Sequence, residues 1–181
     1  MILVVSLFLI LIVFVCFCVW RRFLNEKHAR LCERYGFTEC SDPENVRELI
    51  TKLLSHKSLN IYLLYAKNGI FVGRCSTTLL GGAGSFEKKL SFFILPVVNL
   101  KSFVLCKSRW EEVLFDQRLL VRERDVDVLN IGILSKVNDL VGEKNNYILC
   151  GVDNFVAVLK PSWFFDGHEL DLLCNVDLAS Q

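Results

Sequence analysis

Residues 59–73 read LNIYLLYAKNGIFVG and carry the strongest local fold signal in the chain. Two segments rich in β-forming residues flank Lys67-Asn68-Gly69, and Asn-Gly between such segments is typical of a tight hairpin. Both turn residues must accept positive φ, which Gly and Asn do at the lowest cost. The stretch therefore predicts two antiparallel strands, and the second strand is expected to continue to about residue 80.

Further strand signals surround this hairpin. Residues 86–95 form an apolar strand that ends at a proline, and a second hairpin is expected over residues 147–159. The glycine-rich residues 81–84 lack the G-x-x-x-x-G-K-[ST] spacing of a phosphate-binding loop and lead into a strand, so we interpret them as a hairpin loop. Shorter strands are expected at residues 102–106 and 119–122.

Helix signals occur between the strands. Ser41-Asp42-Pro43-Glu44 combines a capping residue, a proline for the first turn and an early acid, which favours a helix start. Further helices are expected over residues 125–141 and 168–176. Together these elements predict an α+β domain with helices packed on one face of a mainly antiparallel sheet. Apolar residues at helical spacing predict the buried stripe of the first helix: Val46, Leu49, Ile50, Leu53 and Leu54.

The chain before this domain is apolar. Residues 2–20 read ILVVSLFLILIVFVCFCVW and contain no charged side chain. A helix of that length extends about 28 Å, close to the roughly 30 Å hydrocarbon core of a bilayer. A cleaved signal peptide usually has a basic start, a shorter apolar run and a small-residue cleavage site, and the sequence shows none of these. The stretch therefore predicts a retained transmembrane helix.

Aromatic and basic residues mark the expected end of this helix. We interpret Trp20, Arg21 and Arg22 as membrane-flanking residues, since Trp favours the interface and basic flanks favour the cytoplasm. Only the α-amine precedes the apolar stretch, so the domain after it is expected to be cytoplasmic. Cys18 lies next to this boundary and is a candidate for lipidation, with ordinary packing in the bilayer as the alternative. Further cations follow at Lys27, Arg30 and Arg34.

The cysteines indicate the redox compartment in which the domain is expected to lie. Six of the eight lie outside the apolar stretch with wide, irregular spacing, which favours free thiols in a reducing compartment. A secreted or lumenal disulfide-bonded protein is the alternative. The predicted organisation is an anchor at residues 1–22, a juxtamembrane helix and linker at 23–40, and a cytoplasmic α+β domain at 41–181.

Motifs for catalysis, cofactors or metals are not evident in the sequence. It contains no C-x-x-C and no G-x-S-x-G. Asp166, His168, Glu169 and Asp171 lie close together, but acids at a helix start are ordinary capping chemistry. With 21 Lys and Arg against 20 Asp and Glu, the net charge of +1 gives no indication of nucleic-acid binding. No catalytic, cofactor-binding or metal-binding residue is therefore predicted.

The layout resembles a known group of proteins. An anchor with a basic flank, then ARLCERYGF at residues 29–37, then strands leading to Phe93-Ile94-Leu95-Pro96, is similar to bacterial membrane-anchored proteins of unknown function. This resemblance assigns no role to any residue, and a viral membrane-associated accessory protein would have the same layout.

The expected function follows from the anchor. The sequence predicts a single-pass interaction or scaffold protein whose partners are the lipid bilayer and an unidentified protein. Homo-oligomerisation is compatible with this prediction. The alternative from another class is an enzyme or small-ligand binder whose site forms only in the folded domain.

Overall fold

The computed structural model describes residues 2–54, 58–81, 84–97, 102–105, 114–120, 147–161 and 164–175. Contacts between residues divide the chain into two compact units, Met1–Thr38 and Glu39–Gln181. The predicted helix over residues 125–141 lies outside the described residues.

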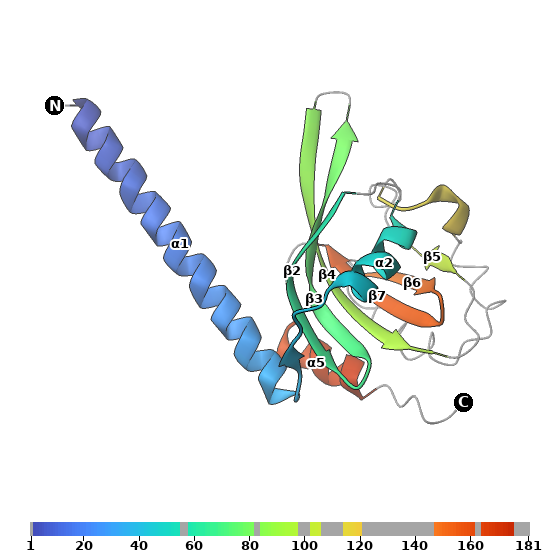
Figure 1. The fold of residues 1–181 in the computed structure, drawn as a ribbon. Coiled ribbons are helices and arrows are strands. Elements are labelled where there is room, and N and C mark those ends of the chain that lie inside the picture. Colours follow the sequence, from blue (N-terminus) through green and yellow to red (C-terminus); the bar gives the residue numbers. More distant parts are fainter. Residues whose placement is uncertain are drawn as a thin grey trace. The chain divides into compact units, whose positions relative to one another are not determined.

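The first unit consists mainly of one helix, α1, which spans Ile2–Arg34 (Figure 1). The prediction that the helix continues beyond the apolar stretch over charged residues is thus confirmed. Gly36 ends α1 in the left-handed conformation, with φ of +76°. Its N–H donates to the Glu33 carbonyl at 2.8 Å, and the Phe37 N–H donates to the Cys32 carbonyl at 3.0 Å. This pairing is a Schellman motif, which satisfies carbonyls that the helix end leaves open.

The second unit is built on a seven-stranded sheet with the order β1-β2-β3-β4-β7-β6-β5. β4 and β7 pair at its centre, and the pairings from β2 through to β5 are antiparallel. With helices added, this confirms the predicted α+β class. The strands are β1 (Thr38–Glu39), β2 (Leu59–Lys67), β3 (Ile70–Gly81), β4 (Gly84–Pro96), β5 (Phe103–Leu105), β6 (Ile148–Val152) and β7 (Phe155–Pro161).

The two predicted hairpins are both present. Asn68 and Gly69 join β2 to β3 with φ of 51° and 79°, as the Asn-Gly signal requires. Asp153 and Asn154 join β6 to β7 with φ of 45° and 67°. This second hairpin has a two-residue turn, because β6 continues to Val152. A longer strand instead of a longer loop keeps more backbone groups hydrogen-bonded.

The strand prediction at residues 119–122 is wrong at Leu119, and residues 121–122 lie outside the described residues. Leu119 lies in a 3-10 helix, η1, that spans Gln117–Leu119, and Leu120 makes an isolated parallel bridge with Val104. A hydrogen bond from the Leu119 N–H to the Asp116 carbonyl closes the turn at 2.9 Å. The short apolar segment thus packs as a turn, a distinction that its composition does not make.

Helix α2 spans Glu44–Leu53 and packs inside the curve of the sheet. All five apolar residues of its predicted stripe are buried, which confirms that prediction. The helix contacts both β2 and β6. Because β3, β4 and β7 lie between those strands, the sheet curls around α2 (Figure 1). Leu90, Phe92 and Ile94 of β4 belong to the hydrophobic cluster that surrounds it.

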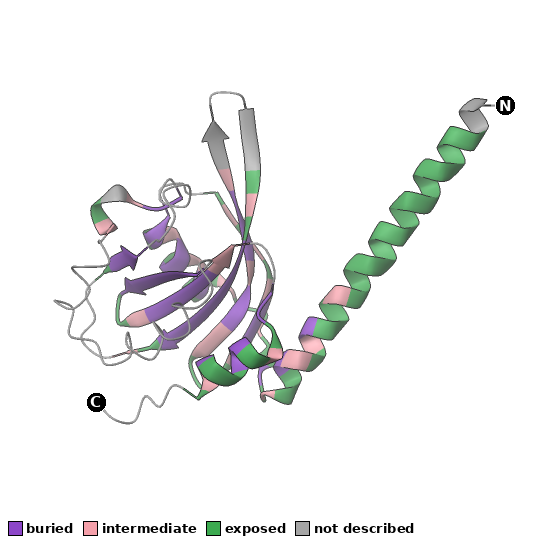
Figure 2. Cartoon of the chain, turned by 180° about the vertical axis from the view of Figure 1, so that it is seen from behind, coloured by how far each residue is buried: buried purple, intermediate pink, exposed green. Residues whose placement is uncertain are grey.

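Helix α5 spans Gly167–Cys174 and covers the opposite face of the sheet (Figure 2). Phe165, just before it, packs edge-on against Phe93 with ring centroids 6.4 Å apart. Side chains alternate along a strand, so Phe93 faces away from the cluster that holds Phe92 and Ile94. The prediction that the helices pack on one face is therefore wrong for α2 and α5. The physical reason is that β4 is apolar on both faces, and each face needs cover.

Gly73 marks a point of close packing in the sheet. A Cβ atom at this position would lie 2.2 Å from the Leu63 carbonyl oxygen and 2.6 Å from a ring carbon of Phe92. The register between β2 and β3 shifts next to it, between Ile61 and Leu63. Glycine is therefore required at this position, where the bulged strand β2 pairs with β3.

Candidate functional site

The predicted boundary residues lie on α1 and are exposed. With about 100° between successive residues, Cys18 and Arg22 lie about 40° apart on one side of the helix, and Trp20 and Arg21 point to other sides. We call these four residues the girdle. The Trp20 and Phe23 rings lie 6.3 Å apart. Their membrane-flanking role and the lipidation of Cys18 stay predictions.

The part of α1 before this girdle exposes apolar side chains on every side. Residues 5–20 are all exposed, as the green helix in Figure 2 shows. By length and composition, this is one helix able to cross a membrane near the N-terminus, a test that a signal sequence also passes. Apolar residues exposed around a whole helix are unusual for a soluble domain.

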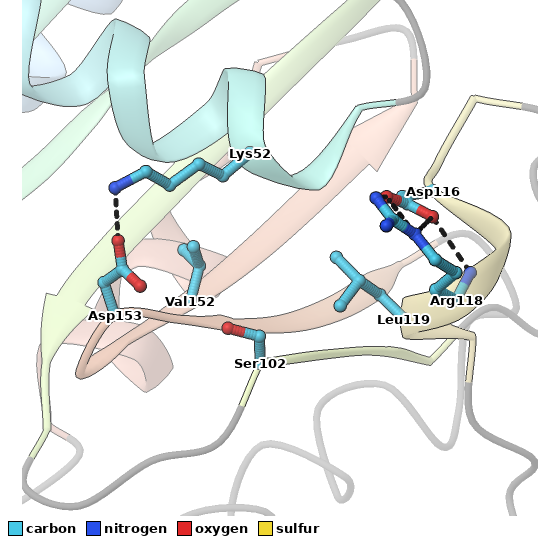
Figure 3. A pocket seen from close by; sticks show the side chains of 7 residues that line it. All are labelled: Lys52, Ser102, Asp116, Arg118, Leu119, Val152 and Asp153. Atoms are coloured by element: carbon cyan, nitrogen blue, oxygen red, sulfur yellow. Dashed lines mark hydrogen bonds and ion pairs between the residues drawn. The ribbon is translucent and has the colours of Figure 1, made fainter.

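A pocket in the second unit forms a separate candidate site (Figure 3). It has a volume of about 410 Å³ and opens widely to the surface. Lys52 contributes from the last turn of α2, whereas Val152 and Asp153 contribute from the end of β6 and its turn. The remaining lining residues come from the start of β5 and the segment around η1: Ser102, Asp116, Arg118 and Leu119.

Two ion pairs stand at opposite ends of this pocket (Figure 3). The Lys52 Nζ lies 2.5 Å from the Asp153 Oδ2 and 2.9 Å from the Glu48 Oε1. The hydrogen bond to Asp153, followed by the one to Glu48, raises the pKa of Lys52. Arg118 pairs with Asp116 through its Nη2 at 2.5 Å and its Nε at 3.0 Å. These hydrogen bonds lower the pKa of Asp116 to about 2.

The chemistry of the pocket is that of a charged but locally neutral surface. Its lining holds two cations and two carboxylates, and each cation is already paired. Val152 and Leu119 provide apolar surface between the two pairs, and the Ser102 hydroxyl adds a donor and an acceptor (Figure 3). Such a surface suits a polar partner that can exchange its own charges with those of the ion pairs.

No pattern in the sequence indicates this pocket. Lys52 and Asp153 are 101 residues apart, and only the fold brings them together. Asp153 is an ordinary turn residue by its pattern, and Lys52 is an ordinary exposed residue of an amphipathic helix.

A buried polar cluster lies on the other face of the sheet, beneath α5. Glu169 accepts hydrogen bonds from Tyr147 and from the Lys160 Nζ at 2.7 Å, and its side chain is 9% exposed. It also accepts the Asp166 N–H at 2.6 Å, while the Asp166 carboxylate accepts the Glu169 N–H at 2.9 Å. Burial, followed by the bond to Glu169, raises the pKa of Tyr147.

This cluster is structural. The interpretation of the acids near residue 168 as helix-start chemistry is confirmed, because Asp166 and Glu169 form a capping box. His168 and Asp171 are exposed. Within the described ranges, no three His, Cys, Asp or Glu side chains lie close enough to hold a metal ion.

The described cysteines are all free thiols, and Cys106 lies outside the described ranges. Cys75 and Cys150 are fully buried in the hydrophobic cluster around α2. Burial raises the pKa of the Cys75 thiol to about 12, so this side chain behaves as a small apolar residue.

Comparison with known proteins adds no relative to this picture. No family model, no curated protein and no solved structure matches the chain.

Proposed function

We propose that this chain is a single-pass membrane protein that holds an α+β interaction domain at the surface of a bilayer. The observation that supports this most strongly is the exposure of the apolar part of α1 around its whole circumference. In the domain, large apolar side chains are mostly buried, and among those described only Tyr62 and Leu172 are exposed. Lipid is the environment that covers an apolar helix of this length most simply.

The energetics favour insertion. Each Leu, Ile, Phe or Val near the centre of a spanning helix contributes roughly 0.3–0.6 kcal/mol towards insertion. The side chains from Leu7 to Val15 are all of these four types, and no charged residue opposes them. The basic residues that follow Trp20 place the domain on the cytoplasmic side in this proposal. A cleaved signal sequence has similar apolar content but would be missing from the mature chain.

For the domain, we propose that it binds a protein partner close to the bilayer. The pocket between α2, η1 and the β6–β7 turn supports this, because its paired charges are accessible and can re-pair with those of a partner. Tethering raises the effective concentration of the domain towards any partner that shares the membrane. Modest contacts at an open pocket then suffice for binding.

Anchoring is tested by charging the helix centre. The double variant Leu11→Arg with Val15→Arg costs about 5–7 kcal/mol of insertion free energy, enough to offset most of the apolar contribution. We expect the unmodified full-length chain to resist extraction from membranes at alkaline pH and the double variant to be released. The control is Tyr62→Arg with Leu172→Arg, which charges the two exposed large apolar residues of the domain. Release of the unmodified chain would contradict anchoring.

Orientation is tested separately with a protease. In sealed vesicles whose cytoplasmic face is inside, a C-terminal tag on the membrane-bound chain is expected to survive added protease until detergent opens the vesicles. Digestion without detergent would contradict the cytoplasmic placement and leave the anchor itself unaffected.

The pocket favours one further candidate function, that of a small-ligand binder. A volume of about 410 Å³ falls within the usual range of ligand sites, although the pocket is open. The double variant Lys52→Gln, Arg118→Gln distinguishes protein binding from small-ligand binding. Its control is the double variant Lys88→Gln, Lys89→Gln, which changes two cations outside the pocket. Loss of a co-purifying protein in the first variant alone supports the interaction module. Loss of heat stabilisation by a small molecule in the first variant alone supports ligand binding.

A further inference from the structure

The charged part of α1 beyond the girdle carries an asymmetric distribution of charge. Lys27, Arg30 and Arg34 follow one another at intervals of three and four residues, so they lie within an arc of about 60° on one side of the helix. All three are exposed. We call this set the cationic stripe.

The acids of the same segment lie beside one edge of this stripe. Around the helix axis, Glu26 and Glu33 lie about 40° and 60° from Arg30 and about 100° and 120° from Lys27. Glu26 pairs instead with Arg22, whose Nε lies 3.1 Å from the Glu26 Oε1. Within the part of the chain that the structure describes, none of the three stripe cations forms an ion pair. Their charge is therefore available to an external anion.

The direction of the helix decides which anion is closest. Side chains of an α-helix tilt towards its N-terminus, which is the membrane side of α1 if the apolar stretch is inserted. Lys27 lies about 10 Å beyond Trp20 along the axis, Arg30 about 15 Å and Arg34 about 21 Å. Long side chains that tilt back bring the first two within about one Debye length of the lipid headgroups.

We propose that the cationic stripe binds the phosphate-bearing headgroups of anionic lipids. This inference rests on the proposed membrane anchor and adds a lipid preference to it. The stripe gives α1 a preferred rotation about its axis, with the Lys27 side towards the headgroups and the acids on the flank next to Arg30. The contribution decreases along the helix, with Lys27 contributing most and Arg34 least.

The test uses the full-length chain in phosphatidylcholine vesicles that contain a minor fraction of phosphatidylserine. Electron paramagnetic resonance of spin-labelled lipids measures how much more strongly each lipid associates with the protein. We expect phosphatidylserine to be preferred, and the triple variant Lys27→Gln, Arg30→Gln, Arg34→Gln to lower that preference about two- to fivefold at low salt. Among single variants, Lys27→Gln should have the largest effect. Added salt should weaken the preference of the unmodified chain.

The control variant removes three charges from the domain instead: Lys67→Gln, Lys88→Gln and Lys89→Gln. An equal loss of preference in the control, or no loss in the stripe variant, would overturn the inference. Inorganic phosphate at matched ionic strength should displace no more labelled lipid than chloride does, and stronger displacement would show a general phosphate site instead. Alkaline extraction of the same samples keeps the two proposals separate, because a chain that resists extraction without a lipid preference refutes only the stripe.

Discussion

The apolar residues of α1 and those of the domain have the same chemistry and opposite environments. Phe14 of α1 is 63% exposed, whereas Phe92 of β4 is fully buried between α2 and the sheet. In the domain, a curled sheet supplies partners for every apolar side chain of its centre. In α1 the apolar residues surround the helix, and no single packing face could cover them. The comparison teaches that the domain buries its apolar side chains in its own core, whereas the apolar side chains of α1 need apolar surroundings from outside the chain.

The largest expected effect comes from the same substitution made in both regions. Phe92→Ala should lower the free energy of unfolding of the domain by about 3–5 kcal/mol, because it leaves a cavity in a close-packed core. Phe14→Ala should leave the domain's unfolding unchanged within error. Chemical denaturation of the full-length chain in detergent micelles, followed by the domain's fluorescence, measures both. Equal destabilisation by the two variants would contradict the proposal that Phe92 packs in the domain core and Phe14 does not.

Removal of a buried charge should lower the free energy of unfolding of the domain almost as much. Glu169→Ala removes the acceptor shared by Tyr147 and Lys160 and leaves the Lys160 ammonium, on a side chain that is 18% exposed, without its carboxylate. We expect a loss of about 3 kcal/mol in the free energy of unfolding. Glu87→Ala removes an exposed acid from β4 and should change it by less than about 0.5 kcal/mol. Similar values for the two variants would show that α5 does not depend on this cluster.

Sequence reasoning succeeds for features that depend on residues close together in the chain. Local rules identified the Asn68-Gly69 turn and the helix-start role of the acids near residue 168, because each depends on residues close in sequence. Periodicity identified the buried stripe of α2 for the same reason.

Features that depend on distant residues were not accessible in that way. The pairing of Lys52 with Asp153 joins residues from the two halves of the chain, and nothing in either local pattern indicates the other. The opposite placement of α2 and α5 follows from the burial of β4 on both faces, which a continuous apolar run allows but does not specify. Leu119 was predicted as a strand because a short apolar segment carries too little periodicity to separate a strand from a turn.

A moderate effect is expected at the first hairpin. Gly69 has φ of +79°, and a Cβ there costs about 1–2 kcal/mol through the backbone conformation alone. Space is not the limiting factor, since the nearest side-chain atom to a Cβ would be 4.0 Å away on Pro96. Gly69→Ala should therefore destabilise the domain by that amount and leave alkaline extraction of the anchored chain unchanged. A change in extraction would mean that the regions are energetically coupled.

The smallest effect is expected from alkaline pH. The pKa of Cys75 is raised to about 12 in the folded domain, against about 8.5 for an exposed thiol. The folded state keeps a proton that the unfolded state loses, so this contribution is complete below pH 8.5 and decreases as pH rises towards 12. Between pH 9 and 10 the free energy of unfolding should fall by about 1.2 kcal/mol more in the unmodified chain than in Cys75→Ala. Parallel pH profiles for the two proteins would contradict the burial of this thiol.

The most direct test of membrane anchoring is the intact mass of the mature chain recovered from washed membranes. We expect the measured mass to include residues 2–20, since these residues form the apolar part of α1 that lipid would cover. A mass that begins after Trp20, or recovery of the full chain only in the soluble fraction, would contradict the account.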